Sequence, residues 1–259
     1  MIRPGQCQCG DVAYEVTGDI EPAALCHCSQ CRRWSGHLWA FCAAPAAQVR
    51  LVEQLGLRWF QSSASARRGY CAGCGSSLFW QSNPDRICFS AGSLNGATGT
   101  RVTRDIFTGD AGDYYALPPG TEKPGSAAAC EILQGGCLCG GVRFTMPGPV
   151  GAITACHCSQ CRRLSGHFAA SFDLVEALLH LTRRETLAVY RTDGGSERGF
   201  CSGCGSSLWF RAKDGGFSVE AGTIDGATGG QMNCHIHVAG KGDYYDLNDG
   251  LPQVFGGTD

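Results

Sequence analysis

The sequence predicts a mainly β protein built from two tandem copies of one domain, with loops organised by clustered cysteines. Three observations carry this prediction: a repeat at a fixed offset, short segments that alternate apolar and polar residues, and cysteines grouped in pairs and triplets. The chain has 259 residues, which is long for one domain and comfortable for two. Each half is therefore large enough to bury a core of its own.

The repeat spans nearly the whole chain. The segment CHCSQCRRWSGH, which starts at Cys26, recurs with one difference as CHCSQCRRLSGH at Cys156, 130 positions later. The same offset relates CAGCGSSL to CSGCGSSL and the two copies of GDYY, with no net insertion. We expect a first domain at residues 1–118 and a second at 135–259, here called copy one and copy two. The stretch between them, 119–134, is rich in Pro, Gly and Ala and is the predicted linker.

Short strands account for most of each copy. Val12, Tyr14 and Val16 alternate with other residues at the period of two that is typical of a strand with one buried face. Only residues 174–181 carry a pattern compatible with two helical turns. Bulky aromatic residues in the strand-like runs are expected to form core or pocket walls, and these are Trp59, Phe60, Trp80, Trp209 and Phe210.

The first group of cysteines in each copy is a pair of knuckles that lie far apart in the sequence. CQCG pairs with CAGCG in copy one, and CLCG pairs with CSGCG in copy two. A glycine follows the second cysteine each time, and its positive φ lets backbone N–H groups point at the thiolates. Four thiolates complete a tetrahedron, which is the pattern of a closed, structural zinc site. The predicted ligands are Cys7, Cys9, Cys71 and Cys74, and Cys137, Cys139, Cys201 and Cys204.

The second group is a C-x-C-x-x-C triplet, which we call the tripod. The tripods are Cys26, Cys28 and Cys31 in copy one, and Cys156, Cys158 and Cys161 in copy two. Three sulfurs from six residues grip one face of a metal and leave its fourth position open, which is the pattern of a catalytic zinc. An open, thiolate-rich zinc suits a substrate thiol, which would lose its proton and could add to a carbonyl carbon. We expect up to four zinc ions per chain.

Other uses of the eighteen cysteines stay open. Disulfides are disfavoured because a C-x-C pair is too close to bridge comfortably. The start MIRPGQCQCG also has no apolar region typical of a secretory signal, so we expect a reducing, cytoplasmic location. Iron–sulfur ligation is disfavoured because paired Gly-knuckles match zinc better. A second structural zinc, capped by a histidine, is the more serious alternative.

Charge and hydropathy narrow the classes of partner. With 21 basic and 23 acidic residues, the chain has no charge excess that suggests a nucleic-acid backbone. No run of eighteen apolar residues predicts a membrane helix. We therefore expect no nucleic-acid partner and no membrane partner, and we expect the two domains to pack on each other.

The order of the motifs, C-x-C-G, C-H-C-x-x-C-R and C-x-x-C-G-S, resembles the glutathione-dependent formaldehyde-activating enzyme family, which also includes centromere protein V. The resemblance covers almost the whole chain, once per copy. It implies a β-tent fold with the closed and open zinc sites on the cysteines named above. The implied activity is the addition of glutathione to formaldehyde to give S-hydroxymethylglutathione, a carbon–sulfur lyase reaction run in reverse. Copy two keeps the family ending from His235 to Val254, whereas Asp105 replaces the histidine in copy one, so copy two is expected to be the active copy.

Histidines near the tripods are candidates for proton transfer. His157 lies inside the second tripod, as His27 does in the first, and His235 lies on an alternating segment. The histidine within each tripod is either a fourth ligand, a proton acceptor for a thiol, or a group that bonds the loop. The arginines after the tripods are Arg32, Arg33, Arg162 and Arg163. Guanidinium groups could pair with the carboxylates of glutathione, but we expect these residues to support thiolate charge or to face solvent. A different class of function also stays open, namely a binding or scaffold module in which every zinc is structural.

Overall fold

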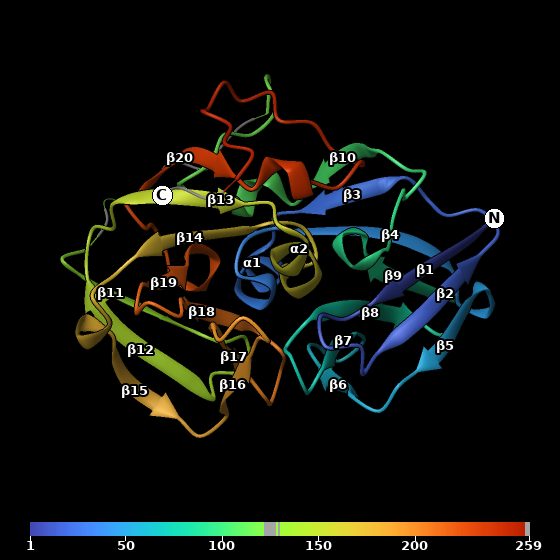
Figure 1. The fold of residues 1–259 in the computed structure, drawn as a ribbon, viewed down its shortest axis with the longest axis horizontal. Coiled ribbons are helices and arrows are strands. Elements are labelled where there is room, and N and C mark those ends of the chain that lie inside the picture. The colour runs from blue at the N-terminus through green and yellow to red at the C-terminus, as the bar shows by residue number, and fades with distance from the viewer. Residues whose placement is uncertain (122–127, 129, 257–259) are drawn as a thin grey trace.

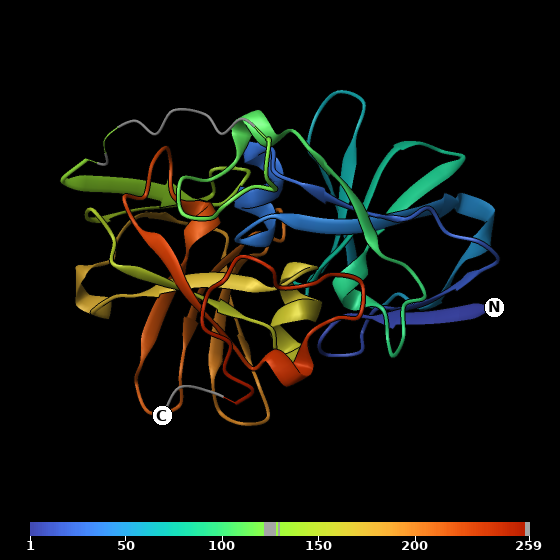
Figure 2. The ribbon, with the colours of Figure 1, turned by 90° about the horizontal axis from the view of Figure 1, so that it is seen from above.

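The structure is a computed structural model that describes residues 1–121, 128 and 130–256. Part of the predicted linker (122–127 and 129) and the last three residues of the chain (257–259) lie outside the described residues. Figures 1 and 2 show two lobes side by side, copy one from blue to green and copy two from yellow-green to red. The prediction of a mainly β protein made of two tandem β-tent domains is confirmed.

Copy one consists of a three-stranded and a seven-stranded sheet. The small sheet is antiparallel, in the order β1 (Ile2–Gln6), β2 (Ala13–Thr17) and β5 (Val49–Glu53). The large sheet has the order β10 (Val102–Ile106), β3 (Ala23–Cys26), β4 (Trp39–Pro45), β9 (Arg86–Ser90), β8 (Ser77–Asn83), β7 (Arg67–Cys71) and β6 (Leu57–Gln61). Within it β10 runs parallel to β3, and the other neighbours are antiparallel.

Copy two repeats this architecture. Its small sheet has the order β11 (Ile132–Gly136), β12 (Val142–Pro147) and β15 (His180–Arg184). Its large sheet has the order β20 (Gln231–Ile236), β13 (Ala152–Cys156), β14 (Ala169–Asp173), β19 (Phe217–Glu220), β18 (Ser207–Arg211), β17 (Glu197–Cys201) and β16 (Leu187–Arg191). Strand β20 again runs parallel to β13. Strand β11 begins at Ile132, before the boundary predicted at residue 135.

Six short 3-10 turns complete the described elements, namely η1 (Ala46–Gln48), η2 (Ala91–Ser93), η3 (Thr108–Asp110), η4 (Glu176–Leu178), η5 (Ala221–Thr223) and η6 (Val238–Gly240). The stretch 174–181 does not form the two helical turns that its sequence permits, since it holds only η4 and the start of β15. Strand β15 pairs with β12, with Leu181 opposite Phe144. Sheet pairing has therefore overridden a weak local helical pattern.

Two helices occur where the sequence suggested only loops. They are α1 (Ser29–Ser35) and α2 (Ser159–Ser165), and each begins directly after the second cysteine of a tripod. In copy one the Cys28 sulfur accepts a hydrogen bond from the Cys31 N–H at 3.3 Å, as an N-cap side chain does. Gly36 ends the helix at φ 87°, the left-handed conformation that glycine tolerates best. At seven residues each helix is too short to show a helical period in the sequence.

Each helix packs against the opposite copy, and Figure 1 shows α1 and α2 together in the middle of the molecule. The Gly222 N–H donates to the Gly36 carbonyl at 2.7 Å, and the Gly92 N–H donates to the Gly166 carbonyl at 2.9 Å. A side chain at Gly222 or Gly92 would come within 2.5 or 2.4 Å of a backbone oxygen of the facing helix. Because the two contacts are related by the repeat offset, the copies meet with approximate two-fold symmetry.

The repeated GDYY segment also bridges the copies. Asp243 accepts hydrogen bonds from the backbone and hydroxyl of Thr98 at 2.9 and 2.7 Å. Asp113 accepts the equivalent bonds from Thr228, both at 3.0 Å. The first tyrosine of each segment accepts a backbone hydrogen bond from β20 or β10 of the other copy at 2.8 Å. This motif, for which the sequence suggested no role, therefore fastens each copy to the other.

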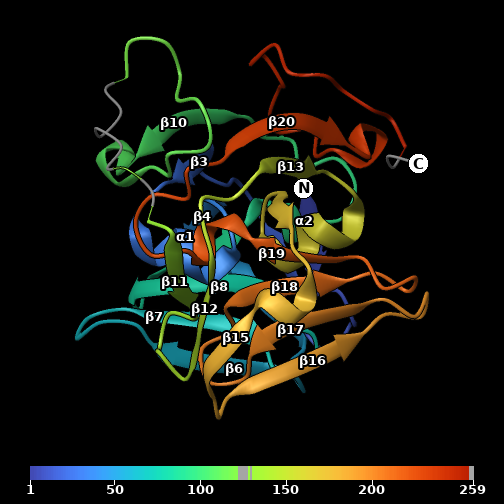
Figure 3. The ribbon, with the colours of Figure 1, turned by 90° about the vertical axis from the view of Figure 1, so that its left-hand side faces the viewer.

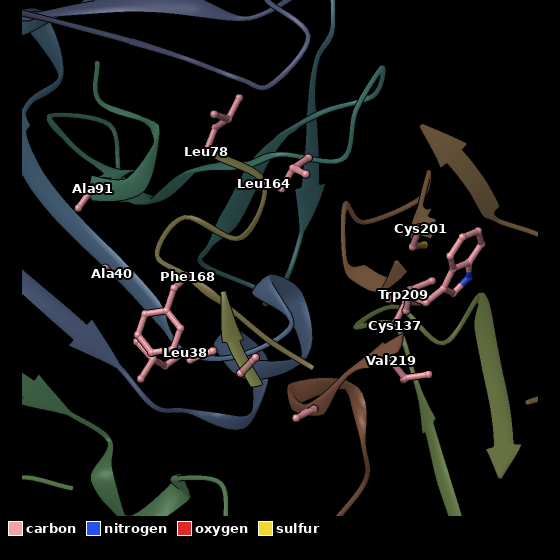
Figure 4. Close-up of a cluster of buried hydrophobic side chains, with 14 of the residues drawn as sticks. Leu38, Ala40, Leu78, Ala91, Cys137, Leu164, Phe168, Cys201, Trp209 and Val219 are labelled. Carbon is pink, nitrogen blue, oxygen red and sulfur yellow. The ribbon is translucent and has the colours of Figure 1, made fainter. Parts of the chain in front are cut away.

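One hydrophobic core runs through both copies. Figure 4 shows Leu164 and Phe168 of copy two among residues of copy one that include Leu38 and Leu78. Burial of each such side chain is worth about 1.5–3 kcal/mol, so separating the copies would expose a costly surface. Figure 3 shows β10 and β20 together at the top of the molecule and β6 and β16 at the bottom. A second cluster surrounds the first tripod and belongs to copy one, and it includes Trp34, Trp39, Phe41, Ala43, Tyr70 and Cys88.

Candidate metal centres

The eight knuckle cysteines gather into two groups of four. In copy one the Cys9 sulfur lies 3.5 Å from that of Cys7 and 3.6 Å from that of Cys71. The equivalent two distances in copy two are both 3.5 Å. Sulfurs around a tetrahedral zinc lie about 3.8 Å apart, since each Zn–S bond is about 2.3 Å. The spacing of the sulfurs in both groups therefore fits zinc. None of the eighteen cysteines, all of which lie among the described residues, forms a disulfide, so every ligand sulfur is free to bind a metal.

The glycines after the knuckles adopt the conformation that the sequence led us to expect. Gly10, Gly75, Gly140 and Gly205 have φ between 77° and 90°. A backbone N–H donates to the first sulfur of each N-terminal knuckle, at 3.3 Å in copy one and 3.1 Å in copy two. These bonds favour the thiolate form that a metal ion requires.

The tripods are assembled from a strand end and a helix start. Cys26 ends β3, Cys28 caps α1, and Cys31 lies in the first turn of α1. The three sulfurs lie within 4.8 Å of one another, and those of copy two do the same at the junction of β13 and α2. Within the described part of the chain, no fourth Cys, His, Asp or Glu atom joins either group. Each tripod thus offers three ligands on one side.

The chemistry of the tripod sulfurs also fits a cation. Hydrogen bonds from the neighbouring thiols Cys156 and Cys161 lower the pKa of Cys158, whereas hydrogen bonding with Cys158 and Cys161 raises the pKa of Cys156. A negative charge on one sulfur therefore makes ionisation of the neighbouring thiol less favourable. A bound divalent ion removes this conflict, because all three sulfurs can then be thiolates. Soft thiolate donors select zinc among the common divalent metals.

An arginine contacts each tripod, buried in the case of Arg68 and half-buried in the case of Arg198, and neither was predicted from the sequence. Arg68 places a guanidinium nitrogen 3.6 Å from the Cys31 sulfur, and Arg198 does the same to Cys161. Arg68 also stacks over the Trp34 ring at 4.9 Å. These cations would offset the negative charge that three thiolates leave on a bound divalent ion. The only signal in the sequence was that an arginine occurs at this place in both copies.

The arginines that directly follow the tripods have other contacts. Arg32 and Arg162 donate to backbone carbonyls in η3 and η6 at 2.9 and 2.7 Å. Arg33 forms an ion pair with Asp225 of the other copy. The four residues Arg32, Arg33, Arg162 and Arg163 thus hold turns and the interface between copies, and none is the guanidinium nearest a tripod sulfur.

The predicted catalytic histidines form a hydrogen-bonded chain in copy two. His157 contacts the Tyr245 hydroxyl at 2.7 Å through Nδ1 and His235 Nδ1 at 2.9 Å through Nε2. His235 Nε2 lies 2.9 Å from an Asp249 oxygen. Because an ionised Asp249 only accepts, His235 donates to it and accepts from His157, which in turn accepts from Tyr245. Burial lowers the pKa of His157 to about 3, so its ring is neutral.

Copy one builds the same arrangement with one link fewer. His27 contacts the Tyr115 hydroxyl through Nδ1 and an Asp105 oxygen through Nε2, both at 2.8 Å. Asp105 therefore takes the place of the pair His235–Asp249. The Asp105 carboxylate accepts a hydrogen bond from His27 Nε2, so the ring proton of His27 lies on Nε2, as it does in His157 of copy two. From the sequence, Asp105 in place of a histidine counted against activity in copy one. In the structure Asp105 still holds His27 in place through a hydrogen bond.

Two cavities border the first tripod segment. Cys26, Cys28 and Cys31 line a pocket of about 550 Å³. His27 borders a second pocket of about 570 Å³ between the copies, which Asp249 also lines. The tripod histidine and the tripod sulfurs therefore face different spaces.

A family model described as "Glutathione-dependent formaldehyde-activating enzyme" matches residues 2–110 and again residues 132–240. The chain belongs to this family. The double match confirms both the resemblance and the tandem duplication. No helix among the described residues of this family member is long and apolar enough to cross a membrane.

Two relatives of this member of the formaldehyde-activating family are informative. A Halomonas elongata protein named "Putative glutathione-dependent formaldehyde-activating enzyme" is 34% identical over 86 residues. This match covers 30% of the present chain and 55% of the relative, so the chain spans about half the length of that protein. A crystal structure of a Rhodobacter sphaeroides protein is 28% identical and covers 40% of this chain and 99% of its own, with a TM-score of 0.32.

Proposed function

We propose that the chain is a zinc-dependent enzyme of the carbon–sulfur lyase type. It promotes adduct formation between a glutathione-like thiol and a small aldehyde such as formaldehyde. The observation that carries this proposal is the open tripod, where three cysteine sulfurs lie together without a fourth protein ligand among the described residues. In copy one these sulfurs border a pocket that can admit a small molecule.

The ligand sets divide by role. The four-sulfur groups would hold structural zinc and tie the start of each domain to a strand hairpin more than sixty residues later. The two tripods would hold zinc at open sites, where the metal, when bound, lowers the pKa of a coordinated thiol and stabilises it as a thiolate. Arg68 and Arg198 would balance the charge of the tripod sulfurs.

The histidines act best as positioning residues. Both ring nitrogens of His157 have partners, and the equivalent His27 faces the cavity away from the tripod sulfurs. His235 links His157 to the carboxylate of Asp249. We therefore assign His157 and His235 to fixing the loop that carries Cys156 and Cys158. All eighteen cysteines are free, which suits the reducing cytoplasm that we propose as the location.

The test replaces one sulfur in each tripod, with Cys28→Ser and Cys158→Ser combined. Formation of the adduct from glutathione and ¹³C-formaldehyde is followed by NMR above the uncatalysed background. We expect the catalysed rate to fall by about a hundredfold or more, since weaker changes around metal sites already cost ten- to a hundredfold. Cys130→Ser, at an exposed cysteine outside both motifs, is the control and should keep full activity. Full turnover by the double variant, with unchanged circular dichroism, would reject the proposal and favour a scaffold with structural zinc alone.

A further inference from the structure

The two copies keep the same tripods but differ in the walls around them. In copy one the tripod pocket is lined by Trp39 and Phe41, whose rings stack at 5.3 Å with an interplanar angle of 16°. The repeat places Ala169 and Ser171 at these positions in copy two. Trp80 adds a third aromatic wall to the pocket. Copy two has an aromatic residue, Phe210, at the position of Trp80, but it lacks the stacked pair that Trp39 and Phe41 form in copy one.

The same contrast occurs at the rim of the pocket. Phe107 lines the pocket, is 63% exposed, and has a φ of 57°. Its equivalent in copy two is His237, with a φ of 54°. Phe107 and His237 thus share a left-handed backbone, a conformation that clusters at active sites and ligand clamps when a residue other than glycine adopts it. Copy one has an exposed aromatic ring among the residues that line its tripod pocket, and the equivalent residue of copy two is a histidine.

The pocket of copy one is also cationic. Its lining includes Arg68, Arg86, Arg104 and one acidic residue, Asp110. Arg86 forms a two-pronged ion pair with Glu21, with both contacts at 2.7 Å. The second arginine of the rim, Arg104, lies 3.9 Å from the same carboxylate, and its side chain is 55% exposed. At the positions of Arg86 and Arg104, copy two has Gly216 and Cys234.

We propose that the first tripod pocket is a specific site for an aromatic thiol that carries a carboxylate, and that the second tripod does not share this specificity. The sulfur of the ligand lies at the tripod, its ring lies against Phe41 and Phe107, and its carboxylate pairs with Arg104. A pocket of about 550 Å³ is large enough for such a molecule. Aromatic rings gain from edge or offset contacts with the walls, and a guanidinium recognises a carboxylate. The inference rests on the proposed function in taking the tripod as a thiol site.

The probes separate the three parts of this ligand. 4-Mercaptobenzoate carries ring, sulfur and carboxylate, mercaptoacetate lacks the ring, and thiophenol lacks the carboxylate. Each is titrated calorimetrically into the zinc-loaded full chain under a phosphine reductant. We expect 4-mercaptobenzoate to bind one site per chain at least about tenfold more tightly than mercaptoacetate, because ring burial adds apolar and aromatic contacts.

The variants assign the site to one copy. Phe107→His introduces the residue of copy two at an exposed position whose backbone already suits histidine there, and it should weaken 4-mercaptobenzoate binding about fivefold or more. His237→Phe, the matched change in copy two, should leave this binding unchanged. Arg104→Gln should weaken binding of 4-mercaptobenzoate by a similar factor and leave the affinity for thiophenol unchanged.

The outcomes distinguish this inference from the proposed function. Equal affinity for 4-mercaptobenzoate and mercaptoacetate, or unchanged binding by Phe107→His, would overturn the assignment of the pocket even if glutathione and formaldehyde still react. Tight, Phe107-dependent binding in a protein that catalyses no adduct formation would uphold the pocket and reject the proposed reaction instead. Formation of adduct is measured on the same zinc-loaded samples.

Discussion

At the scale of single residues, the hydrogen-bond partners of the tripod histidine decide its orientation, and in copy two these partners are Tyr245 and His235. In copy two the carboxylate of Asp249 sets the direction of every hydrogen bond back to Tyr245. Burial keeps His157 neutral, and the hydrogen bonds fix its tautomer and the position of its ring between Cys156 and Cys158. Both ring nitrogens of His157 have hydrogen-bond partners, which supports the positioning role that we propose for this histidine.

The hydroxyl of Tyr245 therefore matters for stability. We expect Tyr245→Phe to lower the free energy of unfolding by about 1–3 kcal/mol, because the substitution leaves the buried Nδ1 of His157 without its donor. Urea unfolding of the zinc-loaded protein measures this change. Tyr190→Phe, at a partly exposed position on β16, serves as the control. An equal and small effect from both substitutions would contradict the role given to the chain of hydrogen bonds.

At the scale of elements, the short helices α1 and α2 do two things at once. Each supplies the third sulfur of a tripod from its first turn, and each ends on a glycine whose carbonyl accepts a hydrogen bond from the opposite copy. The helix of copy one also donates from the Trp34 indole to the carbonyl of Cys204, at 2.9 Å, in the closed site of copy two. The cysteine clusters of the two copies are therefore joined through these helices.

At Gly222 and Gly92 the backbones of the two copies lie so close together that a side chain would clash with the facing helix. We expect Gly222→Ala to lower the free energy of unfolding by about 1–3 kcal/mol, since its Cβ would lie 2.5 Å from the carbonyl oxygen of Arg32. Gly151→Ala is the matched control, because its Cβ would meet nothing within 4 Å. Thermal unfolding of both variants checks the prediction. If Gly222→Ala is no less stable than Gly151→Ala, the interface is looser than described.

The helices also show where sequence reasoning ends for this chain. Strands with alternating burial such as β2 were predictable, and so were the cysteine groups, because spacing alone places their sulfurs. Helices α1 and α2 were not, since seven residues show no period. Arg68 and Arg198 reach the tripods from β7 and β17, strands distant in sequence, and no local motif marks such a contact.

At the scale of the whole molecule, duplication has built one body from two domains. The repeated segments GDYY and the paired glycines cross between copies at equivalent points, and a single core includes residues of both. Sequence comparison between the copies predicts equal metal sites and unequal surroundings. The arrangement around an approximate two-fold axis could not be read from the repeat, because it depends on which surfaces of each copy face each other.

We propose that both four-cysteine groups and both tripods bind zinc. Elemental analysis of protein purified under reductant and equilibrated with zinc gives the number of zinc ions per chain. We expect about four zinc ions per chain, and about two in the variant that combines Cys28→Ser and Cys158→Ser, because the three-sulfur tripods lose affinity with one ligand gone. A value of about two in the unaltered protein would contradict the account, since the tripods would then hold no metal.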